Sequence, residues 1–125
     1  MAGLAKLRGL TPMLRTWEME GSIAFYRDRL GFRVENSSEG WASLSRDGVE
    51  LMLSAPNEHE GDVSPAFTGS LYFLATDIEA LWAQVRGQAR VCYPLEDFDY
   101  GMREFAVYDN NGYLLQFGEP MAGQE

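Results

Sequence analysis

A ten-residue stretch has a weakly similar second copy in the chain, and this repeat restricts the possible folds more than any other feature. "DGVELMLSAP" at residues 47–56 corresponds without a gap to "NGYLLQFGEP" at residues 111–120. A repeat of this kind indicates a repeated structural unit. In each copy an Asp-Gly or Asn-Gly pair stands between apolar runs, and such pairs favour hairpin turns because the turn residues need positive φ. The sequence therefore predicts two copies of one unit that ends in a β-hairpin.

A helix pattern with one apolar stripe precedes each hairpin. The stripe consists of Ile23, Tyr26 and Leu30 in the first copy and of Ile78, Leu81, Trp82 and Val85 in the second. Gly31 and Gly87 are expected to end the two helices, because glycine readily adopts the conformation found at helix ends. Thr76 or Asp77 is expected to cap the start of the second helix.

Further strand patterns flank the helices, so each unit reads βαβββ. These patterns lie at residues 10–15, 32–36, 69–75 and 89–95. We predict an α+β fold in which paired βαβββ modules form a curved mixed sheet, with helices on the outer face and a concave ligand cleft. The chain, residues 1–125, is long enough for one domain with its own core. We place module one at about residues 9–56, a linker at 57–68 and module two at about 69–120.

Alternation along the two hairpins sorts their side chains between the two faces of the sheet. Two-residue turns would pair Leu44 with Leu51 and Tyr108 with Leu115. The face toward the helices would then carry Ala42, Leu44, Leu51 and Leu53, and in the second unit Ala106, Tyr108, Leu115 and Phe117. The opposite face would carry Trp41, Ser43, Ser45, Glu50 and Met52, and in the second unit Phe105, Val107, Leu114 and Gln116. This polar and aromatic mixture suits a small-molecule cleft, although a solvated face or a dimer interface also tolerates it.

The formal charge of −9, from 19 acidic and 10 basic residues, limits the partners. Such a charge repels phosphate backbones, so no nucleic acid partner is expected. It favours a cationic small molecule, and solubility alone also accounts for it. The sequence shows no signal peptide and no apolar run that could span a bilayer. We therefore expect a cytoplasmic protein without a membrane partner.

The single histidine, His59, and the single cysteine, Cys92, exclude several kinds of site. They cannot supply a disulfide within the chain or a metal site built mainly from imidazole and thiolate. We expect His59 to lie in a solvated loop and Cys92 to be a buried structural thiol. Glycine-rich phosphate loops, serine-nucleophile elbows and paired-histidine helix motifs are absent from the sequence.

The repeated units resemble a known family. "SIAFYRDRLGF", "DGVELMLSAP" and "YGMREFAVYDNNGYLLQF" are similar to the glyoxalase, bleomycin-resistance and extradiol-dioxygenase superfamily, the vicinal oxygen chelate proteins, over about residues 9–120. The resemblance points to the first and last strands of each module, where enzymes of this family bind a divalent metal. Here those positions fall at Thr11, Met52, Ser70 and Gln116. They offer neither a charged nor an imidazole ligand, so we predict no metal and no cofactor.

Within the superfamily the chain looks most like the bleomycin-resistance type, which sequesters a planar cationic drug without modifying it. Pro12 matches a proline near the first strand of those proteins, which implies a homodimer that exchanges this strand. An edge-strand proline without exchange is the alternative. Trp41 falls where those proteins place an aromatic ring against the drug, and Tyr100 falls on the tryptophan of their "WGxREF"-like pattern.

The stretch "LEDFDYG", residues 95–101, combines aromatic and acidic side chains that suit a cationic ligand. Glu96 and Asp97 are expected mainly to keep the loop soluble, and Arg103 and Glu104 to form a structural ion pair rather than a catalytic dyad. The predicted ligand-binding residues are Trp41, Glu50, Met52, Phe98, Asp99, Tyr100, Met102, Phe105 and Gln116.

Three functions remain open from the sequence. The first is a metal-free binding protein for a small, planar, cationic molecule, with no catalytic residue. The second is a glyoxalase-like lyase or isomerase, either metal-dependent or cofactor-free with Glu50 as a general base, which would require Glu50 to be buried. The third is a protein interaction module, which would need a continuous apolar patch instead of an enclosed pocket.

Overall fold

The computed structural model describes residues 5–6, 8–56 and 64–122. Two βαβββ modules follow one another, as predicted. The first contains β1 (Met13–Arg15), α1 (Met19–Ala24) continued by the π-helical η1 (Phe25–Arg29), β2 (Arg33–Ser38), β3 (Trp41–Arg46) and β4 (Val49–Ser54). The second contains β5 (Leu71–Leu74), α2 (Ile78–Val85), β6 (Arg90–Asp97), β7 (Met102–Tyr108) and β8 (Leu114–Pro120). The first part of the predicted linker and the loop of His59 lie outside the described residues.

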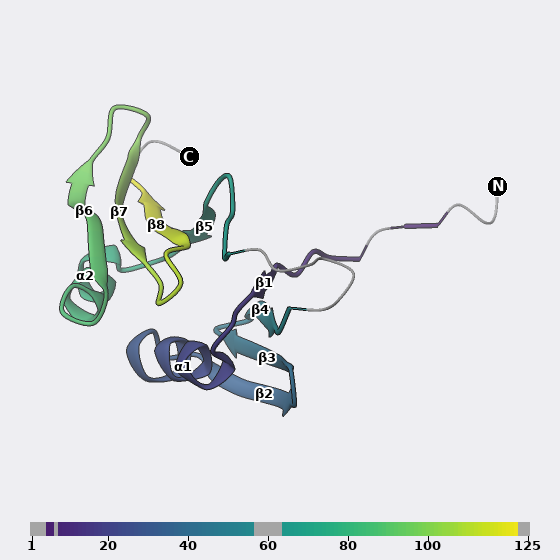
Figure 1. Cartoon of the computed structure of the whole chain (residues 1–125). Coiled ribbons are helices and arrows are strands. Elements are labelled where there is room, and N and C mark those ends of the chain that lie inside the picture. The colour runs from purple at the N-terminus through teal and green to yellow at the C-terminus, as the bar shows by residue number, and fades with distance from the viewer. Residues whose placement is uncertain (1–4, 7, 57–63, 123–125) are drawn as a thin grey trace.

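The strands form two four-stranded mixed sheets, one in each module (Figure 1). Their orders are β1-β4-β3-β2 and β5-β8-β7-β6. The first strand of each module runs parallel to the last, and the other pairs are antiparallel. α1 contacts β4, and α2 contacts β7 and β8. Each helix therefore covers one face of its own sheet, and the α+β fold is confirmed with two sheets instead of one.

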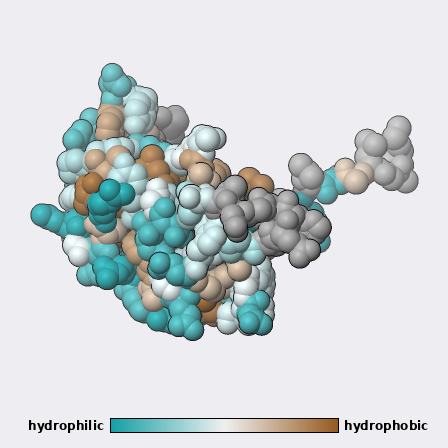
Figure 2. All heavy atoms as spheres, in the orientation of Figure 1, coloured by the Kyte–Doolittle hydropathy of each residue, from teal (hydrophilic) through white to brown (hydrophobic). Residues whose placement is uncertain are grey.

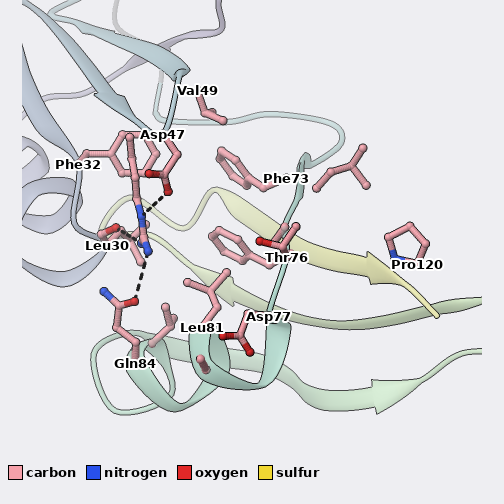
Figure 3. A pocket seen from close by; sticks show the side chains of 16 residues that line it. Leu30, Phe32, Asp47, Val49, Phe73, Thr76, Asp77, Leu81, Gln84 and Pro120 are labelled. Atoms are coloured by element: carbon pink, nitrogen blue, oxygen red, sulfur yellow. Dashed lines mark hydrogen bonds and ion pairs between the residues drawn. The ribbon is translucent and has the colours of Figure 1, made fainter. Parts of the chain in front are cut away.

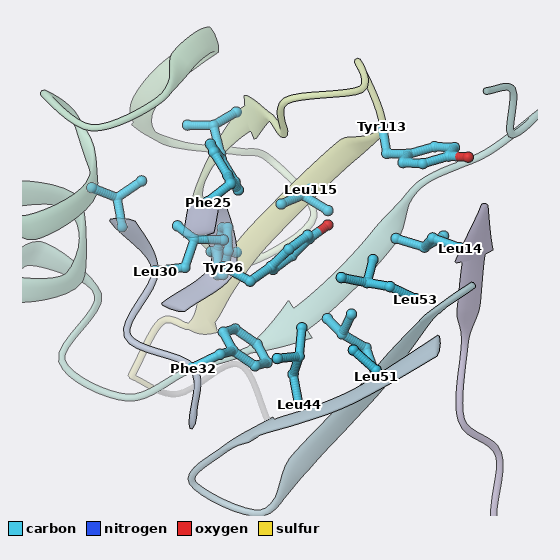
Figure 4. Close-up of a cluster of buried hydrophobic side chains, with 14 of the residues drawn as sticks. Leu14, Phe25, Tyr26, Leu30, Phe32, Leu44, Leu51, Leu53, Tyr113 and Leu115 are labelled. Carbon is cyan, nitrogen blue, oxygen red and sulfur yellow. The ribbon is translucent and has the colours of Figure 1, made fainter. Parts of the chain in front are cut away.

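The hydrophobic core lies on the helix-facing sides of the two sheets and joins both modules (Figure 4). Tyr26 and Leu30 from the first helix stripe are buried there. Tyr113 and Leu115 of the second module pack in the same cluster. Burying each large apolar side chain contributes about 1.5–3 kcal/mol, so this shared core stabilises the pair of modules.

The hairpin of β3 and β4 has the predicted register. Asp47 and Gly48 form the turn with φ of 53° and 81°, the conformation that an Asp-Gly pair tolerates. Leu44 pairs with Leu51. The four residues predicted to face the helix are all buried: Ala42, Leu44, Leu51 and Leu53.

The hairpin of β7 and β8 differs from the prediction by one residue. Tyr108 pairs with Leu114, and the residues between them form a longer loop in place of a two-residue turn. Asp109 holds this loop, because its Oδ1 accepts hydrogen bonds from the N–H groups of Asn111 (2.8 Å) and Tyr113 (2.9 Å). A side chain that accepts backbone hydrogen bonds gives the chain an alternative to the tight turn.

The shifted register reverses the faces of β7, because neighbouring strand residues point to opposite sides. Phe105 and Val107 face the helix in the core, and the ring of Phe105 lies 5.0 Å from that of Trp82 on α2. The prediction that Phe105 and Val107 lie on the uncovered face was therefore wrong. So was the prediction that Ala106 and Tyr108 face the helix.

Of two further local predictions about the second module, the N-cap of α2 is right only in its position, and the burial of Cys92 is wrong. Asp77 stands at the start of α2 with φ of 56°, and neither it nor Thr76 caps the helix with its side chain. Instead, Glu119 of β8 accepts hydrogen bonds from the N–H groups of Asp77 (3.2 Å) and Ile78 (3.1 Å). Cys92 is exposed, not buried.

Gly31 ends the first helix with φ of 76°, as predicted. No helix within the described ranges is both long and apolar enough to cross a membrane.

Candidate functional site

The uncovered face of the second sheet holds a buried carboxylate, Glu104 of β7, whose residue is 0% exposed. Its Oε1 accepts a hydrogen bond from the hydroxyl of Tyr72 on β5 (2.6 Å). Its Oε2 accepts one from the hydroxyl of Tyr93 on β6 and a longer one from Nε2 of Gln116 on β8 (3.5 Å). All four strands of the sheet therefore contribute to this group, which we call the Glu104 cluster.

Strand pairing brings the members of this cluster together. Tyr72 pairs with Gln116, and Gln116 pairs with Ala106. Glu104 lies two residues before Ala106 and therefore points to the same side of the sheet. Gly118 pairs with Glu104, and its lack of a side chain leaves space for the Tyr72 hydroxyl. A Cβ at Gly118 would collide with that hydroxyl. Glycine is thus required here by a close approach of side chains.

The tyrosines of the cluster are hydrogen-bond donors at neutral pH. Burial first, and then the hydrogen bond to Glu104, raise the pKa of Tyr72 and of Tyr93 far above the ordinary value. Both hydroxyls therefore keep their protons, and neither serves as a base or nucleophile near pH 7. The arrangement suits binding better than proton abstraction.

Glu104 lacks a cationic neighbour among the described residues, whose ion pairs do not include it. Arg103 points to the other side of β7 and pairs with Asp97 (2.6 Å) and Glu79 (3.0 Å). The predicted Arg103–Glu104 ion pair was therefore wrong, because adjacent strand residues face opposite ways. Because only neutral groups donate to this carboxylate, no nearby positive charge cancels its negative electrostatic potential. This face therefore favours a cationic ligand.

An aromatic surface borders the cluster at the turn between β6 and β7. The rings of Phe98 and Tyr100 are stacked, with centroids 5.4 Å apart and planes 15° apart, and Tyr93 meets Phe98 edge-on. Gly101, with φ of 88°, closes the turn and leaves Tyr100 60% exposed. The pKa of Tyr100 is raised by desolvation and by a hydrogen bond to Glu104. An exposed ring supported from behind offers one face to a planar ligand.

The nine predicted ligand-binding residues fall into three groups. One group lies on or beside the uncovered face of the second sheet: Phe98, Asp99, Tyr100, Met102 and Gln116. Another lies on the uncovered face of the first sheet: Trp41, Glu50 and Met52. Phe105 lies in the core and does not reach either uncovered face.

Within the described chain no ring contact joins Trp41 to Tyr100, two of the predicted ligand-binding residues. Trp41 is half-buried on β3. Glu50 is exposed on β4, so the burial that a general base at this position would require is not found.

The positions at which the family resemblance places metal ligands do not fit a divalent ion. The hydroxyl of Ser70 donates to Oε1 of Gln116, so the amide oxygen is already engaged, and Gln116 Nε2 donates to the Tyr93 hydroxyl (2.8 Å). In the first module, Thr11 lies before β1, and Met52 offers a thioether on β4, where it pairs with Met13. Hard divalent ions prefer charged oxygen ligands. The metal-free state thus remains a prediction that rests on side-chain chemistry.

Sequence reasoning missed Glu104, Tyr72 and Tyr93 as candidate site residues. Alternation along residues 70–74 puts Tyr72 on the same face as Ser70, which was available as a signal. Glu104 was hidden by the one-residue error in the register of its hairpin. Tyr93 follows a register shift between β6 and β7 that no sequence pattern indicated.

Comparisons with known proteins agree with the fold. The sequence profile described as "Glyoxalase/Bleomycin resistance protein/Dioxygenase superfamily" matches residues 10–117. The bleomycin resistance protein of Geobacillus stearothermophilus is 27% identical over 122 residues, covering 85% of this chain and 92% of that protein.

Two solved structures illustrate the likeness. A bleomycin-binding protein from Streptomyces verticillus, complexed with copper(II)-bleomycin, is 25% identical with a TM-score of 0.69, covering 96% of this chain and 99% of that one. A protein of unknown function from Agrobacterium tumefaciens has a TM-score of 0.79 at 21% identity, covering 94% and 98%.

Proposed function

Because the chain belongs to the glyoxalase/bleomycin resistance protein/dioxygenase superfamily, we propose that it sequesters a small, planar, cationic molecule of the bleomycin class without modifying it. The Glu104 cluster beside the exposed ring of Tyr100 is the observation that carries this proposal. Support also comes from the likeness to bleomycin resistance proteins and from the net charge of −9.

We propose that a planar group of the ligand stacks on Tyr100 while its positive charge lies over the Glu104 cluster. The 60% exposure of Tyr100 leaves its ring accessible. Glu104 is 0% exposed and therefore acts through Tyr72 and Tyr93 as a positioning residue, without touching the ligand itself. A unit charge about 6 Å from a carboxylate gains on the order of 3 kcal/mol at an effective dielectric constant of about 20.

In the proposed homodimer, Trp41 of one chain supplies the second ring of the cleft opposite Tyr100 of the partner subunit. This arrangement accounts for two proposed anchor rings that belong to different modules without a contact between them. It also gives a role to Met52, which lies on the same uncovered face as Trp41. A cleft shared between chains would enclose the ligand, as small-molecule sites usually do.

The interaction-module alternative finds less support. On the face seen in Figure 2, apolar atoms form separate patches between hydrophilic side chains, not one continuous area. The enzyme alternative also finds no support at its proposed base, since Glu50 is exposed in the single chain. Sequestration of a small ligand is therefore the function that the geometry supports best.

Isothermal titration calorimetry with bleomycin, added metal-free and as its copper(II) complex, tests the proposal. We expect saturable binding with Kd in the micromolar range or below, and weaker binding as salt rises, because exposed electrostatic attraction is screened. Absence of binding heat for both forms at several temperatures would overturn the proposed ligand class.

Variants then locate the site. Tyr100→Ala should cost about 2 kcal/mol or more of binding free energy, as anchor aromatics do, and Trp41→Ala should do the same. Glu104→Gln keeps the size and most hydrogen bonds but removes the charge, so it should weaken binding and flatten the salt dependence. Asp99→Asn, an exposed acid in the same turn, is the matched control and should cost about 1 kcal/mol or less. Unchanged affinity in Tyr100→Ala and Glu104→Gln would contradict this site.

A further inference from the structure

A separate cavity of about 650 Å³ lies between the two modules (Figure 3). The β3–β4 turn, the residues after η1, the strand β5 and the helix α2 line it. Phe73 and Phe117 line it, and they alternate along their strands with Tyr72 and Gln116 of the Glu104 cluster. The cavity therefore lies on the opposite side of the second sheet from the proposed bleomycin site. Its volume is in the range of small-molecule pockets.

The walls of this cavity are mainly aromatic and aliphatic, and its polar lining residues are Arg46, Asp47, Thr76, Asp77 and Gln84. The rings of Phe73 and Phe117 are stacked, with centroids 4.8 Å apart and planes 13° apart. Leu81 and Val85 of α2 and Phe32 of the first module also line the space. A flat apolar ligand would bury its faces against these side chains, and each Å² of apolar area removed from water contributes about 25 cal/mol.

Arg46 is the cation among the described residues that line the cavity, and it is fixed in place. Its guanidinium donates to the backbone oxygen of Leu30 (2.7 Å) and to Oε1 of Gln84 on α2 (3.4 Å). These contacts join both modules, so the group is ordered before any ligand arrives. Its ion pair with Asp47 (3.4 Å) involves a carboxylate side chain that is 84% exposed, and such pairs contribute little.

We propose that this cavity binds a small aromatic organic anion, with its rings among Phe73, Phe117 and Leu81 and its acid group on Arg46. A carboxylate or sulfonate would replace the weakly held Asp47 and take two parallel hydrogen bonds from the guanidinium fork. The uncovered face of the second sheet, with Glu104 and Asp99, disfavours the same anion. This inference does not depend on the proposed bleomycin site.

A pair of fluorescent probes tests the inference. 8-Anilino-1-naphthalenesulfonate carries an anionic group, and N-phenyl-1-naphthylamine has the same rings without it. Titration of the intact chain should show saturable binding of the sulfonate, about tenfold tighter than binding of the neutral amine, because of the charged hydrogen bonds to Arg46. Arg46→Gln should abolish this tenfold preference and leave the affinity for the neutral amine nearly unchanged.

Two further variants control the experiment. Arg33→Gln removes an exposed arginine that pairs with Glu35 outside the cavity, and it should leave the preference intact. Ala80→Phe, at an exposed position of α2 that lines the cavity, should fill the space and weaken both probes even if Arg46→Gln fails to fold. Equal affinity for the two probes, or equal effects of Arg46→Gln and Arg33→Gln, would overturn the inference. So would undiminished binding of both probes to Ala80→Phe.

Discussion

Glu104 is a side chain that packing alone does not explain. Burial of a carboxylate costs several kcal/mol unless hydrogen bonds replace its water, and an apolar residue would fill this sheet position more simply. Here Tyr72, Tyr93 and Gln116 provide the hydrogen bonds. Among the described residues no buried side-chain polar atom lacks a partner. We therefore interpret the Glu104 cluster as the source of a negative electrostatic potential on the uncovered face of the second sheet.

Gly118→Ala should weaken bleomycin binding while the fold is kept. The added Cβ would collide with the Tyr72 hydroxyl and break its 2.6 Å hydrogen bond to Glu104. Gly118 does not have positive φ, so alanine suits its backbone conformation. The broken hydrogen bond to the buried Glu104 should lower the free energy of unfolding by about 1–3 kcal/mol. Calorimetry of binding together with urea unfolding checks this.

Gly87→Ala is the matched control for Gly118→Ala. A Cβ at Gly87 has no neighbour within 4 Å, and its φ is not positive. The Gly87→Ala variant should bind bleomycin with the same affinity as the unchanged protein. Equal affinity of Gly118→Ala and Gly87→Ala would show that the Tyr72–Glu104 contact does not matter for the ligand.

At the scale of elements, the loop between β7 and β8 is tied to η1 across the module boundary. The Tyr26 hydroxyl of η1 donates to Oδ2 of Asp109 (2.6 Å), and both residues are buried. Burial raises the pKa of Asp109, while the hydrogen bond from Tyr26 partly offsets that rise. Asp109 is therefore more easily protonated in the folded protein than in the unfolded chain. Its contribution to stability is greatest at low pH and is lost as pH rises through its folded pKa.

An NMR titration of the side-chain carboxyl groups should find the midpoint of Asp109 above that of Asp97, whose pKa is lowered by the hydrogen bond from Arg103. Tyr26→Phe should raise the Asp109 midpoint further, because it removes a hydrogen bond to the charged form. The same variant should lower the free energy of unfolding by about 1–3 kcal/mol. A midpoint of Asp109 at or below that of Asp97 would contradict this account of the loop.

The two hairpins show how far sequence reasoning reaches. At Asp47-Gly48 the local preference of the pair decides the turn, so the register and the faces of β3 and β4 followed from the sequence. At Asn111-Gly112 the same kind of signal is overridden by Asp109, which accepts backbone hydrogen bonds within a longer loop. Because Asp109 is also held by Tyr26, more than eighty positions away, local pattern alone does not fix this register.

At the scale of the whole molecule, Trp41 and Tyr100 belong to separate modules, and we expect dimerisation to bring them together. β1 is an edge strand that pairs with β4 of its own chain, and the described residues 8–12 before it extend away from the helices (Figure 1). Leu10 in that segment is 94% exposed. Exchange of the first strand between subunits remains a prediction, and Pro12 at an edge also fits a strand that is not exchanged.

Sedimentation equilibrium at micromolar concentration should therefore give a mass of twice the 14.1 kDa chain. The result should hold at high salt if apolar contacts around Met13 and Trp41 hold the dimer, because such contacts are not screened. A single species of 14.1 kDa across the concentration range would remove the shared cleft from the proposal.

The central claim is that a planar cation binds over the Glu104 cluster, and an NMR titration tests it most directly. Amide spectra of the protein should be recorded while bleomycin is added. We predict that the largest shifts fall on Tyr72, Tyr100 and Glu104, while Leu81 and Gln84 of the separate cavity shift little. Shifts concentrated around Leu81 and Gln84, with β7 unchanged at saturation, would contradict the claim.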